Sequence, residues 1–388
     1  MNRRLYNILI TLSLSLLLIA CSNDSLAYYD DDAVSDGYGI TFVLTAGGSL
    51  PATRGFKPTP TPGSEYENYV DIVSKNFCVL VFAMSDDNIY RYQETFEVEE
   101  IQQVTNGEYH VKGRLNAHYS DFCLVVLTNQ SYSISDNSSK PYPVDGSDLK
   151  KDETTLADLC SMSCMQYQHP HTAEAAPFVP SEVTPIPMFG LQAYKGTKLK
   201  DRVMVKLSTP INLMRAMAKI EVTLKDIPVG DLRSICIEGY SKTGYYMPLV
   251  TETMNITATD GFPKTVHIPD GAYSSETISF HKTDEMKYVV YVPEYRNTDS
   301  GVTPSRIKMQ FYDILETKHL DFKEYMADMN NNGSLGDAFD ILRNHCYSFT
   351  VTRSAGKLYV QFQYQVLDWT KVDNGNLNFG NEDGNARE

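Results

Sequence analysis

Apolar and polar residues alternate along several short stretches of this chain, which is the pattern of half-buried β-strands. In residues 358–367, four apolar side chains alternate with three glutamines. In residues 39–45, Ile40, Phe42 and Leu44 alternate with polar or smaller residues. Because alternate side chains of a strand point to the same face, we expect these three to be buried together.

Further runs rich in β-branched and aromatic residues predict strands at 77–83, 91–98, 108–114, 121–128, 203–207, 217–224, 234–238, 277–281, 287–292, 306–312 and 347–351. The best helix candidate in the first half, residues 156–165, is short. No helices of the length found in βαβ units separate the strands. We therefore predict an all-β fold of two tandem antiparallel β-sandwich domains with few short helices, at residues 39–207 and 208–388.

The first twenty residues have a different pattern. Arg3 and Arg4 precede an apolar run at 8–20, which is shorter than the roughly 20 residues that a helix needs to cross a bilayer. We predict a signal peptide at residues 1–20. Small residues before Cys21 resemble a bacterial lipobox, so we expect Cys21 to be lipidated and residues 21–38 to form a flexible tether. A secretory signal followed by a chance cysteine is the alternative.

Size and charge limit the classes of function. Removal of residues 1–20 would leave 368 of the 388 residues, enough for two domains with separate cores. The formal charge of −15 would become −17 with the loss of Arg3 and Arg4. Nucleic acids and anionic membranes are bound through clustered Lys and Arg. The net field therefore argues against both partners, and we predict no nucleic-acid binding.

Six cysteines would remain besides Cys21, an even number that permits disulfides in an exported protein. Cys78 and Cys123 lie in apolar runs, where a free thiol behaves as a small hydrophobe. Cys160 and Cys164 are four residues apart, with two histidines of a His-Pro-His segment nearby. Zinc binding is the minor alternative for this pair, because that segment has the composition of a loop.

The sequence lacks the common catalytic motifs: there is no His-Glu-x-x-His, no Gly-x-Ser-x-Gly and no phosphate-binding glycine loop. We predict that the chain is not an enzyme and needs no cofactor. An extracellular hydrolase is a minor alternative, because the separation of two catalytic carboxylates depends on the fold.

One loop partly matches a calcium-binding pattern. Asp328, Asn330 and Asn332 occupy ligand positions 1, 3 and 5, and Gly333 occupies position 6. Position 12, which should be a bidentate glutamate, is Phe339. We interpret the segment as a tight turn, with calcium binding as the weaker alternative.

Seven segments together resemble the fimbrillin-like lipoproteins that build adhesive fimbriae, the type V pili, of Bacteroidota. They are the lipobox at Cys21, residues 40–45 with Arg54, Ile-Pro-Met-Phe-Gly at 186–190, Arg-Ala-Met-Ala-Lys-Ile at 215–220, Tyr-Val-Pro-Glu at 291–294, Leu-Arg-Asn-His-Cys-Tyr at 342–347 and Val-Leu-Asp-Trp at 366–369. Phe189 departs from the resemblance, which favours a smaller polar residue there.

The resemblance implies two transthyretin-like sandwich domains and export to the outer membrane as a surface lipoprotein. It also implies cleavage by an arginine-specific protease in the N-terminal loop, for which Arg54 is the candidate, and departure of the first strand. The vacated groove would accept a strand from another fimbrial subunit. The donor candidate is residues 370–380, with Leu377 and Phe379 as the apolar side chains.

Strand exchange is physically reasonable, because burial of Ile40, Phe42 and Leu44 contributes about 5–9 kcal/mol at roughly 1.5–3 kcal/mol per side chain. That is comparable to the stability of a whole domain. The alternatives to these two roles are a frayed tail at 370–380 and an ordinary exposed arginine at Arg54. A surface lipoprotein that binds glycan or host protein without polymerising, or a fimbrial anchor subunit, is the alternative function.

Overall fold

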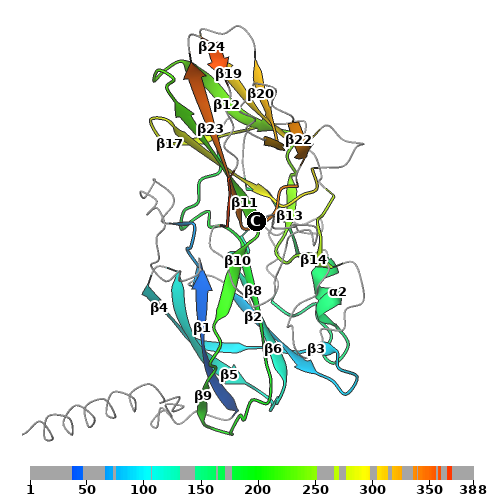
Figure 1. The fold of residues 1–388 in the computed structure, drawn as a ribbon. Helices are drawn as coiled ribbons and strands as arrows, with labels where there is room; N and C mark the ends of the chain where they lie inside the picture. The colour runs from blue at the N-terminus through cyan, green and yellow to red at the C-terminus, as the bar shows by residue number, and fades with distance from the viewer. Residues whose placement is uncertain are drawn as a thin grey trace, which may run out of the picture.

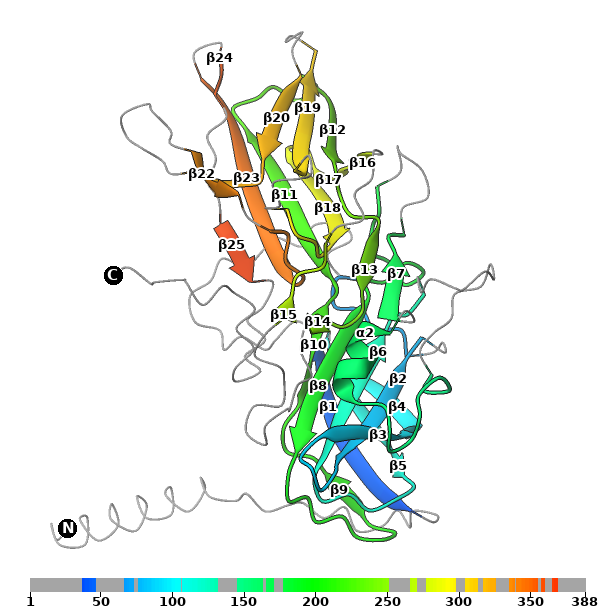
Figure 2. The same cartoon turned by 90° about the vertical axis from the view of Figure 1, so that its right-hand side faces the viewer.

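The residues that the structure describes form two modules of β-structure, one above the other in Figures 1 and 2. The computed structural model describes residues 37–46, 66–72, 76–105, 107–131, 145–162, 165–170, 177–250, 266–270, 277–297, 304–312, 317–325, 335–338, 340–354, 357–359 and 365–368. Within these ranges strands predominate and helix is scarce, so the predicted all-β fold is confirmed.

The first module is a nine-stranded sheet. Its strands lie in the order β3 (Tyr90–Thr95), β2 (Cys78–Met84), β6 (Phe122–Thr128), β8 (Met188–Tyr194), β10 (Ile211–Arg215), β1 (Tyr38–Ala46), β5 (Glu108–Leu115) and β4 (Glu97–Thr105), with β9 (Met204–Lys206) also paired to β1.

This sheet wraps round on itself. Its two end strands, β3 and β4, are consecutive in the chain, and Phe96 alone separates them. The Phe96 amide donates to the Val79 carbonyl at 2.8 Å, and Phe96 is 3% exposed. The wrapped sheet therefore encloses a core, and every residue of β6 is buried.

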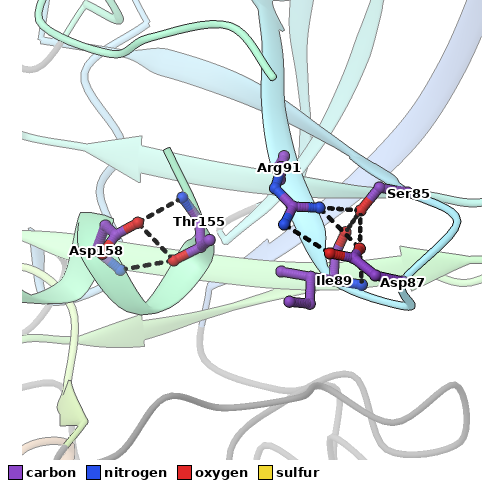
Figure 3. A network of polar contacts seen from close by, with 6 residues as sticks. All are labelled: Ser85, Asp87, Ile89, Arg91, Thr155 and Asp158. Atoms are coloured by element: carbon purple, nitrogen blue, oxygen red, sulfur yellow. Dashed lines mark hydrogen bonds and ion pairs between the residues drawn. The ribbon is translucent and has the colours of Figure 1, made fainter. Parts of the chain in front are cut away.

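The helix α2 (Leu156–Ser161) is shorter than the predicted 156–165. Thr155 caps it, accepting from the Asp158 amide, while the Asp158 carboxylate accepts from the Thr155 amide (Figure 3). This reciprocal capping box fixes the first turn. Met162 adopts an extended conformation, which ends the helix.

A polar turn joins β2 to β3 next to this helix (Figure 3). Arg91 forms a bidentate ion pair with Asp87, with both distances 2.7 Å, and also donates to Ser85. Hydrogen bonds from Arg91 and Ser85 hold the pKa of Asp87 well below its usual range. The turn is thus closed by side chains as well as by backbone.

The second module is a β-sandwich. One sheet contains β17 (His281–Asp284), β18 (Lys287–Pro293), β11 (Met217–Lys225), β23 (His345–Ser354) and β24 (Lys357–Tyr359), with β25 (Gln365–Asp368) also on β23. The other contains β16 (Thr277–Ser279), β12 (Leu232–Glu238), β19 (Arg306–Phe311) and β20 (Lys318–Asp321). Buried residues of both sheets form one core, including Val222, Phe349, Ile237 and Met309.

Three two-stranded pairs complete the described structure: β7 (Gln166–Gln168) with β13 (Thr243–Tyr245), β14 (Leu249–Val250) with β15 (Val266–His267), and β21 (Lys323–Tyr325) with β22 (Leu335–Ala338). Of the strand predicted at 358–367, the two ends form β24 and β25, which both pair antiparallel with β23. The residues between them lie outside the described ranges.

The sheets are mixed, which corrects the expectation of purely antiparallel sheets. Strand β1 runs parallel to β9 and β10, and β11 runs parallel to β23. Alternation within a strand reports which side chains are buried, but it carries no information on the direction of the partner strand. The pattern therefore could not predict which strands pair or in which direction.

The two cores meet within the β10–β11 segment. Met217 belongs to the first hydrophobic cluster, whereas Ala218 and Ile220 belong to the second. The predicted domain limits, 39–207 and 208–388, stay a prediction. The change from one core to the other occurs about ten residues after the predicted boundary.

Five cysteines are free thiols in the described part of the chain. Cys78 and Cys123 are buried in β2 and β6, and burial raises the pKa of both, to about 12 for Cys78. The expectation of small buried hydrophobes at these two positions is confirmed. The described residues contain no helix that is long and apolar enough to span a bilayer.

Candidate functional site

Strand β1 is an interior strand of the first module (Figure 1). It pairs antiparallel with β5 from Tyr38↔Leu115 to Thr45↔Glu108. On its other side it pairs parallel with β9 along its first half and with β10 along its last three residues. Loss of β1 would leave the facing edges of β5, β9 and β10 without their backbone partners, which is a template for another strand.

The inward side chains of β1 are those that the sequence pattern selected. Ile40 and Leu44 are 0% exposed and Phe42 is 1% exposed. Ala46, at the end of the strand, is also buried. The Phe42 ring lies against the Phe96 ring, with 5.7 Å between centroids. The strand and its buried face are as expected, whereas displacement of the strand stays a prediction.

A glycine next to β1 leaves room for the Phe96 ring. Gly113 on β5 is paired with Ile40, and a side chain at that position would meet the Phe96 ring at 2.7 Å and the Glu97 carbonyl. The ring of Phe96 therefore occupies space that only a glycine leaves open. Removal of Ile40 and Phe42 would expose a groove whose walls are Phe96 and the strands β5, β9 and β10.

The end of β1 is fastened by a tight approach of two backbones. The Ala46 amide donates to the Gly107 carbonyl at 2.6 Å. Gly107 has φ +85°, and a side chain there would collide with the Ala46 carbonyl. Glycine satisfies both requirements. Arg54 follows eight residues after Ala46 in the sequence and lies outside the described residues.

Residues 66–72 are hydrogen-bonded to the first module. The Val70 amide donates to the Tyr109 hydroxyl at 3.1 Å, and the Asp71 amide donates to the Asn129 side chain at 2.8 Å. Asn129 in turn donates to the Tyr69 carbonyl. These bonds fix the segment that follows the predicted cleavage site.

The same segment also contacts the region between the modules. Arg215, which is 2% exposed, donates to the Glu67 carbonyl at 2.9 Å and to the Asn344 side chain at 3.0 Å, and it also contacts Asn68. Burial lowers the pKa of Arg215 to about 10. One guanidinium thus joins residues 66–72, the end of β10 and the residue that precedes β23.

A buried charge cluster lies next to this arginine. The Lys219 ammonium is 2.8 Å from carboxylate oxygens of both Glu67 and Glu221, and the Tyr291 hydroxyl donates to Glu67 at 2.6 Å. Burial opposes the charged form of Lys219, but the two carboxylates outweigh it and hold its pKa above the usual value. We name Glu67, Arg215, Lys219 and Glu221 the junction cluster.

Four of the segments that carry the resemblance meet at this junction. The Ala216 amide donates to the Pro187 carbonyl, and the Asn344 amide donates to the Met217 carbonyl, both at 2.8 Å. Ala218 pairs with Val292 across the β11–β18 ladder. The segments therefore form one structural unit, although they are far apart in the sequence.

Arg343 and Glu294 form a second buried pair in this unit, 2.7 Å apart, with side chains 1% and 4% exposed. The guanidinium also donates to the carbonyls of Tyr246 at 3.0 Å and Met247 at 3.3 Å. The Phe189 ring lies 6.0 Å from this guanidinium carbon. The unexpected aromatic at position 189 therefore provides a face for the buried cation.

Other predicted sites lie outside the described residues: Cys21, Arg54, Cys164, His171, Asp328, Asn330, Asn332, Leu377 and Phe379. Cys160 is buried, and burial raises its thiol pKa to about 12. His169 is 2.8 Å from the Tyr291 carbonyl through Nε2. Within the described ranges no group of three or more His, Cys, Asp or Glu could hold a metal ion.

Sequence reasoning missed the role of residues 66–72, because an isolated Glu-Asn pair in a polar loop carries no periodic or spacing signal. It also missed β8 and β10, which frame the junction. Met188–Tyr194 contains β-branched residues at no position, and Ile211–Arg215 is short, so neither meets the strand pattern.

No protein-family model and no curated protein matches the chain. Solved structures do. The tip fimbrial protein Mfa3 from Porphyromonas gingivalis, with C-terminal truncation, matches 86% of this chain and 100% of its own, with TM-score 0.52 and 12% identity. A fimbrial assembly protein from Parabacteroides distasonis matches 85% of this chain and 99% of its own, with TM-score 0.43 and 13% identity. At this identity the first match establishes a shared fold.

Proposed function

We propose that this chain is a structural subunit of cell-surface adhesive fimbriae, exported as a lipoprotein, cleaved after Arg54 and assembled by β-strand exchange. The observation that carries the proposal is the position of β1, an interior strand with three fully buried apolar side chains. An arginine follows eight residues after its end, in a loop dense in Gly and Pro. The fold shared with a fimbrial tip protein supports the same function.

The geometry gives strand exchange a strong driving force. Loss of β1 removes the hydrophobic contribution of Ile40, Phe42 and Leu44 and leaves unpaired backbone groups on both sides. An incoming strand with apolar residues at alternate positions would restore both the buried apolar contacts and the backbone hydrogen bonds. This mode of binding is β-strand addition. Residues 66–72 are held by their own hydrogen bonds, so cleavage at Arg54 would free β1 without releasing the rest of the chain.

In this proposal the partners are other fimbrial subunits, with Leu377 and Phe379 of one copy entering the groove of the next. The mature precursor is held at the outer membrane through Cys21 before cleavage, and the processed subunit resides in the fimbrium. Adhesion to a host or bacterial surface ligand is the role of the assembled fibre.

The test compares cleavage and assembly of the mature chain. An arginine-specific protease should give a product that begins at Gly55, and that product should enter detergent-resistant polymers. Arg54→Lys is the matched control, because it keeps the charge but not the cleavage site. A cleaved chain that stays monomeric, or that retains residues 38–46 in its sheet after cleavage, would contradict the proposal.

A second experiment tests the groove and the donor separately. A synthetic peptide of residues 38–46, added in excess during cleavage, should occupy the groove and shorten the polymers. Leu377→Asp with Phe379→Asp should stop growth but leave cleavage at Arg54 unchanged. Unchanged polymer length in the double variant would remove residues 370–380 from the donor role.

A further inference from the structure

Basic residues concentrate in one short segment of this acidic protein. Residues 195–206 contain five basic side chains, at Lys195, Lys198, Lys200, Arg202 and Lys206, and one acid, Asp201. The whole chain has a formal charge of −15. We name residues 195–206 the basic loop; it ends in β9, at the end of the first module away from the second module (Figures 1 and 2).

The backbone of the basic loop is well anchored. The Thr197 amide donates to the Ser120 carbonyl at 2.8 Å, and the Gly196 amide donates to the Asp121 carboxylate at 2.6 Å. Leu199 within the loop and Leu207 directly after it are buried. The loop therefore has a defined shape, and ordering it on a partner costs little further entropy.

The basic side chains point outward from this anchored backbone. The four lysines of the loop are exposed, and Arg202 has a side chain that is 66% exposed. The four lysines line a surface hollow of about 550 Å³. At physiological salt, exposed charges are screened beyond about 8 Å, so a partner at this surface meets the local positive charge rather than the negative total.

The basic loop also lies beside the first residues that the structure describes, Gly37 and Gly39. The Arg202 amide donates to the Gly37 carbonyl at 3.0 Å, and Met204 pairs with Gly39. Cys21 is sixteen residues before Gly37. The predicted flexible tether would span about 20–25 Å if it behaved as a Gly-rich coil, and repulsion among Asp30, Asp31 and Asp32 would extend it further. A lipid on Cys21 would therefore keep the basic loop close to the membrane surface.

We propose that the basic loop binds the phosphates of anionic lipid headgroups and holds the precursor against the membrane until cleavage; the inference rests on the proposed lipid anchor. Clustered lysines next to an anchor provide a second, electrostatic attachment, each contributing through attraction to the anionic surface. Cleavage after Arg54 separates the lipid from the basic loop. The remaining electrostatic attachment alone is weak and reversible, so the subunit can leave the membrane.

The experiment measures binding of the whole mature chain, residues 22–388 without lipid, to sedimented vesicles. Vesicles of phosphatidylcholine with about 30% phosphatidylglycerol should bind the protein, and pure phosphatidylcholine should not. Lys195→Glu with Lys198→Glu and Lys200→Glu should lower the partition coefficient on the order of tenfold or more. Raising the salt from about 0.1 M to about 1 M, which shortens the Debye length from about 10 Å to about 3 Å, should abolish the binding.

The matched control is Lys150→Glu with Lys151→Glu and Lys225→Glu, which changes the net charge equally at exposed sites elsewhere. Equal loss of binding in both triple variants would overturn the proposal, because net charge alone would explain it. Loss of a salt-sensitive self-association in the first variant, with vesicle binding intact, would assign the basic loop to a second copy of the chain and also overturn it. Both variants should still be cleaved after Arg54 and assemble, so failure here is distinguishable from failure of the proposed function.

Discussion

Replacing Phe42 by alanine is the most direct measure of how firmly β1 is held in the uncleaved protein. Phe42 is 1% exposed and packs on Phe96 with 5.7 Å between ring centroids. Truncation of a fully buried phenylalanine to alanine costs about 3–5 kcal/mol, which combines lost transfer free energy with the cavity left behind. The ring contact itself accounts for about 0.5–1.5 kcal/mol of that.

The assay is urea unfolding of residues 22–388. It yields the free energy of unfolding of the first module. Phe42→Ala should lower it by about 3–5 kcal/mol. The double variant with Phe96→Ala should lose about 0.5–1.5 kcal/mol less than the sum of the single variants, because the two rings share one contact. Val43→Ala is the matched control on the same strand, since Val43 faces the other side and is only half-buried.

A destabilisation of Phe42→Ala within about 0.5 kcal/mol of the control would refute the reasoning, because a surface change is of that size. It would mean that the groove does not close round this ring. Departure of such a strand would cost little free energy, and binding of a replacement strand would gain little. Strand exchange at β1 would then lack its driving force.

Three further predictions concern the surroundings of β1 and the junction. Glu67→Gln should destabilise the chain by about 1.5–3 kcal/mol in thermal or urea unfolding, because it removes one of the two carboxylates that contact Lys219 and leaves the other, Glu221, in place; a loss under about 0.5 kcal/mol would show that the junction cluster does not depend on this pair. Gly113→Ala should lower the yield of folded protein and the unfolding midpoint, because the methyl group meets the Phe96 ring at 2.7 Å; an unchanged midpoint would contradict the tight packing. Burial opposes ionisation of Glu221, but its lysine neighbours outweigh burial and lower its pKa. Glu221 therefore stabilises the folded chain above its unfolded pKa of about 4.3, and this stabilisation is lost as the pH falls through its lower folded pKa. Glu221→Gln should therefore flatten the acid limb of a stability–pH curve, and an identical limb in both proteins would be the contrary result.

The local pattern of the chain was enough to predict β1 and its buried face. Ile40, Phe42 and Leu44 alternate with less apolar residues, and a strand with one face in a core requires that alternation. The burial of both Cys78 and Cys123 was predicted from the same kind of evidence, because both lie in short apolar runs. These are properties that a segment of five to ten residues carries by itself.

The partners of those segments could not be predicted in the same way. The motif segments around Arg215 and Arg343 were recognised only by resemblance, and their contact at the junction depends on the path of the chain between them. Glu67 gave no signal at all, because its partner Lys219 is more than a hundred residues away in the sequence. The lysines of the basic loop are adjacent in the sequence but were not singled out there, because the net charge is negative; the place of the loop beside Gly37 depends on the fold.

The sequence by itself determined that this protein is built of strands, which face of each strand is apolar, and that an arginine follows the first strand. The tertiary structure decided that the first strand is an interior one, that it lies parallel to β10, and that the segment beyond the predicted cut is fixed at the junction of the two modules. The physical reason is the range of the forces. Side-chain alternation is set by neighbours in the chain, whereas strand order and buried charge pairs are set by residues that meet only after the sheets have closed.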